Sequence, residues 1–194
     1  MPRNFNQDQP RRPRADSERN RARLVEAAKQ RFADQGAGAA LEQIARDAGV
    51  GIGTLYRHFP TRDALIETVY RQEVDTLVAA AGELEERCPP VDALREWLML
   101  FLDFLETKQG IGSVLDTLIG GSEPLYSGTP ALLSPPINLL VERANDSGEI
   151  TIDITPLDLL RAIVGVATIR PGTGWKRQAV VLVDLLLRGA QRPL

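Results

Sequence analysis

The fold is decided by the stretch LEQIARDAGVGIGTLYRHF, residues 41–59. Its first half has apolar residues at the i, i+3, i+4, i+7 spacing of a one-faced helix: Leu41, Ile44, Ala45 and Ala48. Gly49 then stands where a left-handed residue ends a helix. Pro60 limits the second half, because the residue before a proline is pushed out of the helical region. We therefore predict a second short helix from about Gly51 to Arg57, and two short helices joined by a tight turn are typical of a helix-turn-helix.

The second short helix is predicted to turn its polar residues outward, because Leu55 and Phe59 take the inward positions. The outward set is Gly51, Gly53, Thr54, Tyr56, Arg57 and His58. Hydroxyl groups and imidazole can bind phosphate oxygens, and a guanidinium can bind phosphate or reach a base edge. Arg62 begins the next helix, where a cation opposes the helix dipole, and a bound phosphate would resolve that conflict. These residues predict a nucleic-acid interface.

The distribution of charge agrees with such a partner. The net charge is −3, yet residues 1–62 carry +5 and residues 63–194 carry −8. A basic end joined to an acidic remainder is expected when one end meets a polyanion. Residues 1–15 hold three prolines and are predicted to form a flexible basic arm, with Arg11, Arg12 and Arg14 as candidate minor-groove contacts. A merely solubilising tail is the alternative.

The longer stretch LEQIARDAGVGIGTLYRHFPTRDALIETVYR, residues 41–71, resembles the N-terminal DNA-binding domain of the tetracycline-repressor-like (TetR) family of bacterial transcriptional regulators. The resemblance implies phosphate contacts by Thr54, Tyr56, His58 and Arg62, with Gly51, Ile52 and Gly53 nearest the bases. Two departures are visible. The family usually has Thr or Ser just before the second helix, where this chain has Ala39 and Ala40, and it often has Ser or a larger residue in place of Gly51.

The remaining pattern predicts an all-α fold. Further helices are expected at about 18–35, 62–86, 91–108, 113–119, 136–147, 156–169 and 175–189, with Ser17 capping the first. The segment EITIDIT, residues 149–155, alternates like a strand, but without a partner strand it is predicted to be an extended connector. We expect a helix-turn-helix domain at 16–62 and a larger helical domain for ligand binding and dimerisation at 63–194.

Two sites are predicted in the larger domain. The run AVVLVDLLL, residues 179–187, is apolar almost all round, so a homodimer interface with the helix at 156–169 is expected to bury it. The candidate interface residues are Leu160, Ile163, Val164, Ala167, Val180, Val183, Leu186 and Leu187. The candidate wall of a small-molecule effector pocket is Trp97, Phe101, Phe104, Leu118, Tyr126 and Ile137. Plain core packing is the alternative for each of these six.

The sequence therefore predicts a cytoplasmic, nucleoid-associated homodimeric regulator, a repressor that binds a palindromic double-stranded DNA operator and an unknown effector. The chain has one histidine and one cysteine, which argues against a metal site, and no nucleophile–base arrangement that would indicate an enzyme. No cofactor is expected. No stretch approaches the roughly 18 apolar residues of a membrane span. A helical adaptor that binds protein through Tyr56 and Arg57, or an enzyme with a helix-turn-helix docking module, remains the alternative.

Overall fold

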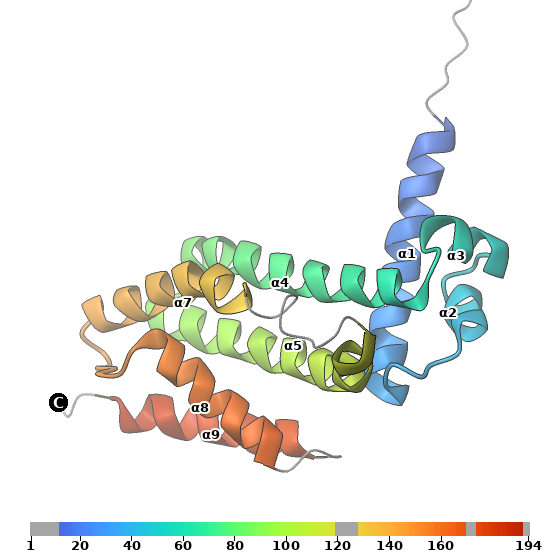
Figure 1. Ribbon diagram of the computed structural model, residues 1–194. Helices are drawn as coiled ribbons and strands as arrows, with labels where there is room; N and C mark the ends of the chain where they lie inside the picture. Colours follow the sequence, from blue (N-terminus) through green and yellow to red (C-terminus); the bar gives the residue numbers. More distant parts are fainter. Residues whose placement is uncertain (1–11, 119–127, 170–173, 192–194) are drawn as a thin grey trace, which may run out of the picture.

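The computed structural model describes residues 12–118, 128–169 and 174–191, and most of them are helical (Figure 1). The helices are α1 (Arg12–Gln35), α2 (Leu41–Asp47), α3 (Ile52–His58), α4 (Arg62–Arg87), α5 (Pro90–Leu118), α7 (Thr129–Asp146), α8 (Pro156–Ile169) and α9 (Trp175–Gly189). The described residues contain no strand. The all-α fold predicted from the sequence is confirmed.

The first three helices form a small bundle at one end of the molecule (Figure 1). Leu24, Ala28 and Phe32 follow one another at four-residue spacing on α1 and are fully buried. This spacing gives α1 a single apolar stripe. The helices α2 and α3 pack against α1 and add the fully buried Ile44 and Leu55 to the same core.

The turns of this bundle are closed by local hydrogen bonds. Gly49 has a φ of 66°, the left-handed conformation predicted for it, and the Val50 amide donates to the Ala45 carbonyl at 2.9 Å. Thr61 caps α4, because its hydroxyl accepts a hydrogen bond from the Ala64 amide at 3.1 Å. These bonds fix the direction in which α3 leaves α2 and α4 leaves α3.

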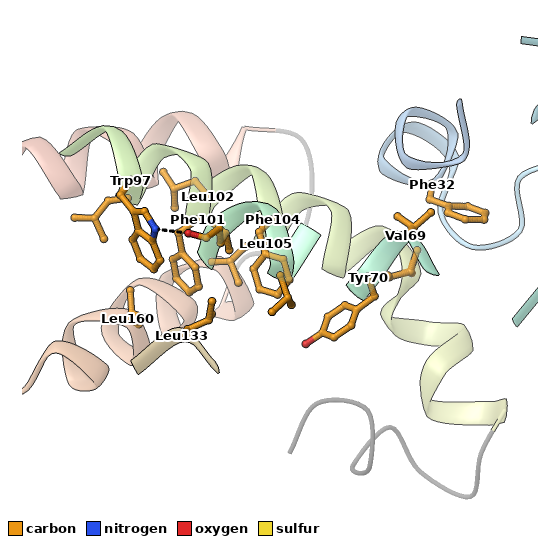
Figure 2. Packing of buried hydrophobic residues seen from close by; sticks show 14 of the residues in the cluster. Phe32, Val69, Tyr70, Trp97, Phe101, Leu102, Phe104, Leu105, Leu133 and Leu160 are labelled. Carbon is orange, nitrogen blue, oxygen red and sulfur yellow. Dashed lines mark hydrogen bonds between the residues drawn. The ribbon is translucent and has the colours of Figure 1, made fainter. Parts of the chain in front are cut away.

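The larger part of the core lies between α4, α5 and α7 (Figure 1). The helix α9 packs on α5, and α8 packs on α7 and α9. Trp97 is fully buried, and its indole Nε1–H donates to the Leu77 carbonyl at 2.8 Å. The ring of Trp97 stacks on Phe101 with centroids 5.9 Å apart, and Phe104 continues the row toward Tyr70 (Figure 2). This aromatic row extends along α5 toward the end of the molecule formed by α1, α2 and α3.

The helix α1 begins earlier than predicted. It starts at Arg12, so Ser17 lies inside it and cannot be its cap. Pro13 does not prevent this start, because a proline in the first helical turn removes no intrahelical hydrogen bond. Arg12 and Arg14 therefore belong to α1, although their side chains lie outside the described part, and Arg11 lies outside it altogether. Residues 12–15, which we predicted to belong to a flexible arm at 1–15, are therefore helical.

The helix α5 is longer than predicted. It runs without a break to Leu118, whereas we expected it to end near Lys108 and a separate helix to follow. The misleading residue is Gly110. Its α-carbon lies so close to α1 that a Cβ there would be 2.1 Å from the Phe32 carbonyl oxygen. Gly36, at the end of α1, has a φ of 72° and faces the Gly110 carbonyl. The glycine at 110 therefore allows a close helix crossing and does not end a helix.

The helix α7 also begins earlier than predicted, at Thr129 and not near Pro136. Pro130 lies in its first turn, where a proline fits. Pro135 and Pro136 lie inside the helix and remove two backbone donors. The carbonyls they would have bonded belong to Ala131 and Leu132, which are exposed and can be hydrated.

The segment 149–155 is an extended connector, as predicted. Ile150 forms an isolated antiparallel bridge with Gln191, and the Thr151 amide donates to the Ala190 carbonyl at 2.8 Å. The connector thus ties the end of α9 to the link between α7 and α8.

Candidate DNA-binding surface

The surface of α3 is formed by the residues that the sequence placed there. Leu55 and Phe59 are buried and hold the helix on the bundle. Arg57 is exposed, and Tyr56 has 47% of its surface exposed. Thr54, His58 and Ile52 are half-buried. In the described ranges, the side chains of Tyr56 and Arg57 make no hydrogen bond or ion pair, so their polar groups remain available to a ligand.

The two glycines of this surface are not required by the fold. Neither Gly51 nor Gly53 has a positive φ, and a Cβ added at either would meet no atom within 4 Å. Gly51 is the N-cap of α3, where glycine is among the preferred residues. Gly53 lies inside the helix, where glycine costs about 1 kcal/mol relative to alanine. A residue that weakens the helix without relieving any contact inside the protein indicates that something outside it approaches the backbone closely.

Arginines of α1 position the helix-turn-helix through contacts inside the protein. The guanidinium of Arg21 lies 5.1 Å from the centre of the Phe59 ring, which anchors the end of α3. Arg31 pairs with Asp47 at the end of α2, and the hydrogen bond from Arg31 lowers the pKa of the Asp47 carboxyl. These contacts join α1 to both other helices of the bundle. The sequence did not show this role, because the arginines read simply as positive charge.

Arg62 makes contacts inside the protein that the sequence did not predict. Its Nη1 donates to the carbonyl oxygens of Ala37 at 2.8 Å and Ala39 at 2.5 Å. The side chain therefore holds the loop between α1 and α2. The conflict between a cation and the start of α4 is resolved by these two carbonyls, and no phosphate is needed to explain Arg62.

The start of α2 lacks a side-chain cap. Ala40 occupies the N-cap position and makes no side-chain hydrogen bond. The two carbonyls bound by Arg62 lie directly before this position. Arg62 thus fixes the loop that a Ser or Thr cap would otherwise help to fix.

Comparisons with known proteins agree with this geometry. A model of the bacterial regulatory proteins of the tetR family matches residues 24–69. HTH-type transcriptional regulators of Staphylococcus aureus are 31% identical over 74 residues, and the match spans 38% of this chain and only 40% of theirs. The likeness to a TetR transcriptional regulator from Streptomyces coelicolor extends much further: 37% identity, a TM-score of 0.80, 90% of this chain and 99% of that one.

The chain belongs to the TetR family. A TetR transcription regulatory protein from Mycobacterium vanbaalenii is similar over the same extent, with 29% identity, a TM-score of 0.71 and coverage of 92% of this chain and 99% of that one. These relatives are transcriptional regulators with a helix-turn-helix. Within the described ranges, no helix of this TetR-family chain is long and apolar enough to cross a membrane, and no cluster of side chains could hold a metal ion.

The C-terminal part of the TetR-family chain contains a cavity of about 220 Å³ between α5, α7 and α8. Phe101 and Phe104 of the predicted effector pocket line it. Trp97 and Ile137 are fully buried core residues and do not line it. The side chain of Leu118 and the whole of Tyr126 lie outside the described residues.

Most of the cavity wall was not predicted. The further lining residues are Leu105, Lys108, Thr129, Pro130, Leu133, Leu157, Leu160, Arg161 and Val164. Leu160 and Val164 had been assigned to the dimer interface. The helical periodicity of α8 predicts which of its residues share one face. It does not predict which element that face packs against.

The helix α9 is only partly covered by the rest of the described chain. Val183 and Leu187 of α9 are buried, and α9 packs against α5 and α8. Leu160 and Ile163 of α8 are buried as well, and all four residues belong to the hydrophobic core of the chain. The predicted Val180 is half-buried, and the side chain of Ala167 lies outside the described part. The exposed apolar residues of α9 are Val181, Leu185 and the predicted Leu186, which are 59%, 60% and 40% exposed.

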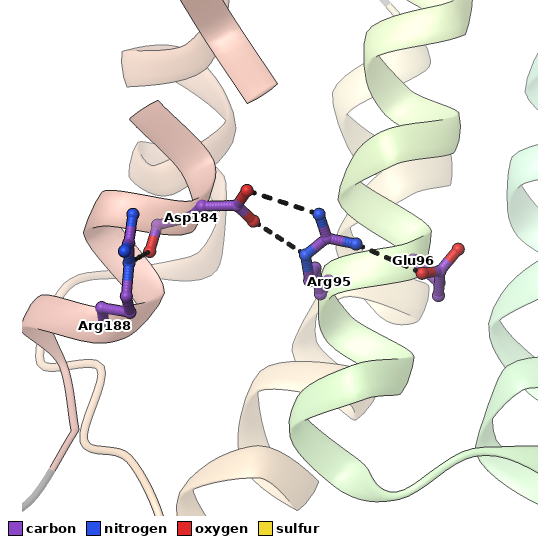
Figure 3. A network of polar contacts seen from close by, with 4 residues as sticks. All are labelled: Arg95, Glu96, Asp184 and Arg188. Atoms are coloured by element: carbon purple, nitrogen blue, oxygen red, sulfur yellow. Dashed lines mark hydrogen bonds and ion pairs between the residues drawn. The ribbon is translucent and has the colours of Figure 1, made fainter. Parts of the chain in front are cut away.

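Ion pairs hold α9 on α5. Lys176 Nζ lies 2.7 Å from Asp103 Oδ1 near the start of α9. Further along, Arg95 donates to both carboxylate oxygens of Asp184, at 2.7 and 3.4 Å (Figure 3). The hydrogen bond from Arg95 lowers the pKa of Asp184. Asp184, the one acid in the apolar run, thus fixes which side of α9 faces α5.

Proposed function

We propose that this protein is a homodimeric repressor that binds a palindromic DNA operator through α3 and releases it when a small effector binds the C-terminal domain. The observation that carries the proposal is the outer face of α3. Its Tyr56 and Arg57 side chains are unpaired in the described structure, and Gly53 weakens the helix without relieving any contact inside the protein. Such a protein would work in the cytoplasm, on the nucleoid.

The proposed DNA contacts come from α3 and from the arginines near the N-terminus. Thr54, Tyr56 and His58 bind phosphates, and Arg57 binds a phosphate or a base edge. Gly51, Ile52 and Gly53 lie nearest the bases, where the missing side chains let the backbone approach. Arg11, Arg12 and Arg14 are proposed minor-groove contacts. Arg62 contributes by fixing the loop before α2, because its Nη1 is held by two backbone carbonyls.

The proposed dimer forms through the uncovered side of α9. Val181, Leu185 and Leu186 would be buried against the same helix of a second subunit, with α8 alongside. Two-fold symmetry would then present two copies of α3 to the two halves of a palindrome.

The proposed response to an effector runs through two connections between the domains. The long helix α4 begins beside α3 and continues into the C-terminal core, and α5 crosses α1 closely at Gly110. The two α3 helices of the dimer would have different spacings in the conformations that bind and do not bind the operator. A small molecule that binds one of these conformations more tightly shifts the equilibrium between them by that difference in binding free energy and by no more.

The test is binding of the purified protein to DNA from upstream of its own gene, measured by fluorescence anisotropy. We expect the double variant Tyr56→Ala, Arg57→Ala to lose at least about tenfold in affinity, because it removes polar contacts to the duplex. Arg87→Ala, an exposed arginine at the end of α4, is the matched control and should bind like the wild type.

Salt dependence separates a repressor from a helical protein-binding adaptor. Release of counterions makes the affinity for DNA fall steeply as salt rises. A double variant that binds as tightly as the wild type, or an affinity that does not depend on salt, would contradict the proposal.

A further inference from the structure

A buried ion pair joins the helix-turn-helix bundle to α4. Glu73 of α4 is only 7% exposed, and its Oε1 lies 2.8 Å from Nζ of Lys29 on α1. Among the described residues, Lys29 is the one cation that pairs with Glu73. A carboxylate that is taken out of water needs such a partner to stay ionised. The pair therefore relates the position of α1 to that of α4.

The pair lies close to the point where α1 approaches α5 most tightly. The helix α1 crosses both α4 and α5 (Figure 1). Lys29 precedes Phe32, whose carbonyl faces Gly110, by three residues, or about 4.5 Å along the helix axis. A single close crossing leaves two helices free to rotate about the point of contact. A second contact with a different helix, at Glu73, restrains that rotation.

The pair is better suited to orient the helices than to stabilise them. The side chains of Glu73 and Lys29 are 8% and 30% exposed, so both lose much of their hydration. The attraction between two such charges roughly repays the cost of removing them from water, and apolar side chains of similar size often stabilise a fold equally well. Apolar packing is non-directional, whereas an ion pair is kept only while its two side chains meet.

The angle between α1 and α4 decides where α3 lies. The helices α2 and α3 pack on α1, and Arg21 and Arg31 of α1 hold the ends of α3 and α2. The bundle therefore moves with α1 when α1 rotates. An angle that is fixed at Glu73, twelve residues after the start of α4 at Thr61, fixes α3 relative to the C-terminal helices.

We infer that Lys29 and Glu73 are positioning residues that fix the angle between the helix-turn-helix bundle and α4. The pair raises the fraction of molecules whose α3 helices fit the operator, and the apparent affinity for DNA is proportional to that fraction. The effect on operator binding rests on the proposed function. The restraint on the angle does not depend on it.

The test replaces both residues by methionine, which has an unbranched side chain of similar length and no charge. The variant Lys29→Met, Glu73→Met leaves no buried charge without a partner, so we expect its melting temperature to stay within a few degrees of the wild type. Glu67→Met, Arg71→Met is the matched control. It also removes one cation and one anion, from a more exposed pair that lies within α4.

The angle is measured by pulsed electron paramagnetic resonance on the full-length protein without DNA. Spin labels are attached after Glu42→Cys and Glu83→Cys at exposed positions of α2 and α4, with Cys88→Ser in every variant. An excess of unlabelled protein ensures that each distance lies within one chain. We expect one narrow distance distribution for the wild type and the control, and a broader or shifted one for the Lys29→Met, Glu73→Met variant.

The same variant should bind DNA from upstream of its own gene at least about threefold more weakly than the wild type and the control. An unchanged distance distribution overturns the restraint on the angle. A melting temperature lower by more than about ten degrees overturns it as well, because the pair would then serve stability. A broader distribution with wild-type affinity overturns the role in operator binding. A wild-type protein that binds no DNA contradicts the proposed function, and the distances still decide whether the pair fixes the angle.

Discussion

At the scale of single residues, α3 is built for contact more than for its own stability. Leu55 and Phe59 hold it on the bundle, while Gly53 weakens it and Tyr56 and Arg57 remain unpaired in the described structure. A helix of this composition depends on its neighbours for its position. The contacts of Arg21 with Phe59 supply part of that support.

Gly53→Ala should therefore change stability and DNA binding in opposite directions. The added methyl meets no atom within 4 Å in the protein, and alanine favours the helix by about 1 kcal/mol. We expect the melting temperature to rise by a few degrees, and the affinity for operator DNA to fall, because the methyl occupies the space of the duplex. Thermal unfolding and anisotropy measure the two effects. An alanine variant with unchanged affinity would show that the backbone at 53 does not approach DNA.

Arg62→Gln should lower the stability of the protein and leave its ionic contacts with DNA unchanged. The variant loses the hydrogen bonds to the carbonyls of Ala37 and Ala39, and a hydrogen bond from a charged group is worth about 1.5–3 kcal/mol. We expect a lower melting temperature and an unchanged salt dependence of DNA affinity. A variant with normal stability whose plot of log affinity against log salt concentration loses about one unit of slope per arginine would instead show a phosphate contact.

The sequence could predict residues whose role is local. The left-handed Gly49, the Thr61 cap and the inward Leu55 each follow from their immediate neighbours. It could not predict the role of Arg62, because the carbonyls that bind this side chain lie 23 and 25 residues earlier in the chain. A contact of that kind depends on the packed bundle and leaves no periodic pattern.

At the scale of elements, the crossing of α1 and α5 shows how a glycine misleads. Glycine weakens a helix in isolation, so Gly110 reads as a break. In the structure α5 continues through it, because the missing side chain lets the helix approach the Phe32 carbonyl. The same reading failed for α7, where Pro135 and Pro136 lie inside a helix that begins at Thr129. Local propensity sets the boundaries only where packing does not override it.

Gly110→Ala should disturb this crossing. A Cβ 2.1 Å from the Phe32 oxygen forces the helices apart, and overpacking of this kind costs about 1–3 kcal/mol or more. We expect the melting temperature, measured by thermal unfolding, to fall by at least several degrees. Gly82→Ala is the matched control: Gly82 lies in α4, and a Cβ there meets nothing within 4 Å. Equal melting temperatures for the two variants would rule out a tight crossing.

At the scale of the whole molecule, the uncovered side of α9 lies opposite the side that is fixed on α5. Ion pairs made by Arg95 and Lys176 join α9 to α5, and this leaves Val181 and Leu185 facing outward. The apolar run could be recognised in the sequence. Its division into an inner and an outer side could not, because the run is apolar almost all round and only the tertiary contacts choose between its sides.

Leu185→Arg should convert the proposed dimer to monomers. The substitution would bury an unpaired charge at the interface, which is strongly unfavourable. We expect monomers by light scattering and a large loss of operator affinity, because the two α3 helices are no longer linked. Leu132→Arg, at an exposed leucine on α7, is the matched control and should remain dimeric. A Leu185→Arg protein that stays dimeric would place the interface elsewhere.

The close crossing at Gly110 also has a consequence in genetic terms. A glycine codon has no conservative missense neighbour, since every amino acid that replaces glycine brings at least a Cβ. At Gly110 each replacement meets the Phe32 carbonyl, whereas at Gly51 and Gly53 the same replacement meets nothing inside the protein. We expect mutations at 110 to be lost whatever promoter the protein controls. Those at 51 and 53 would be free to change together with the operator.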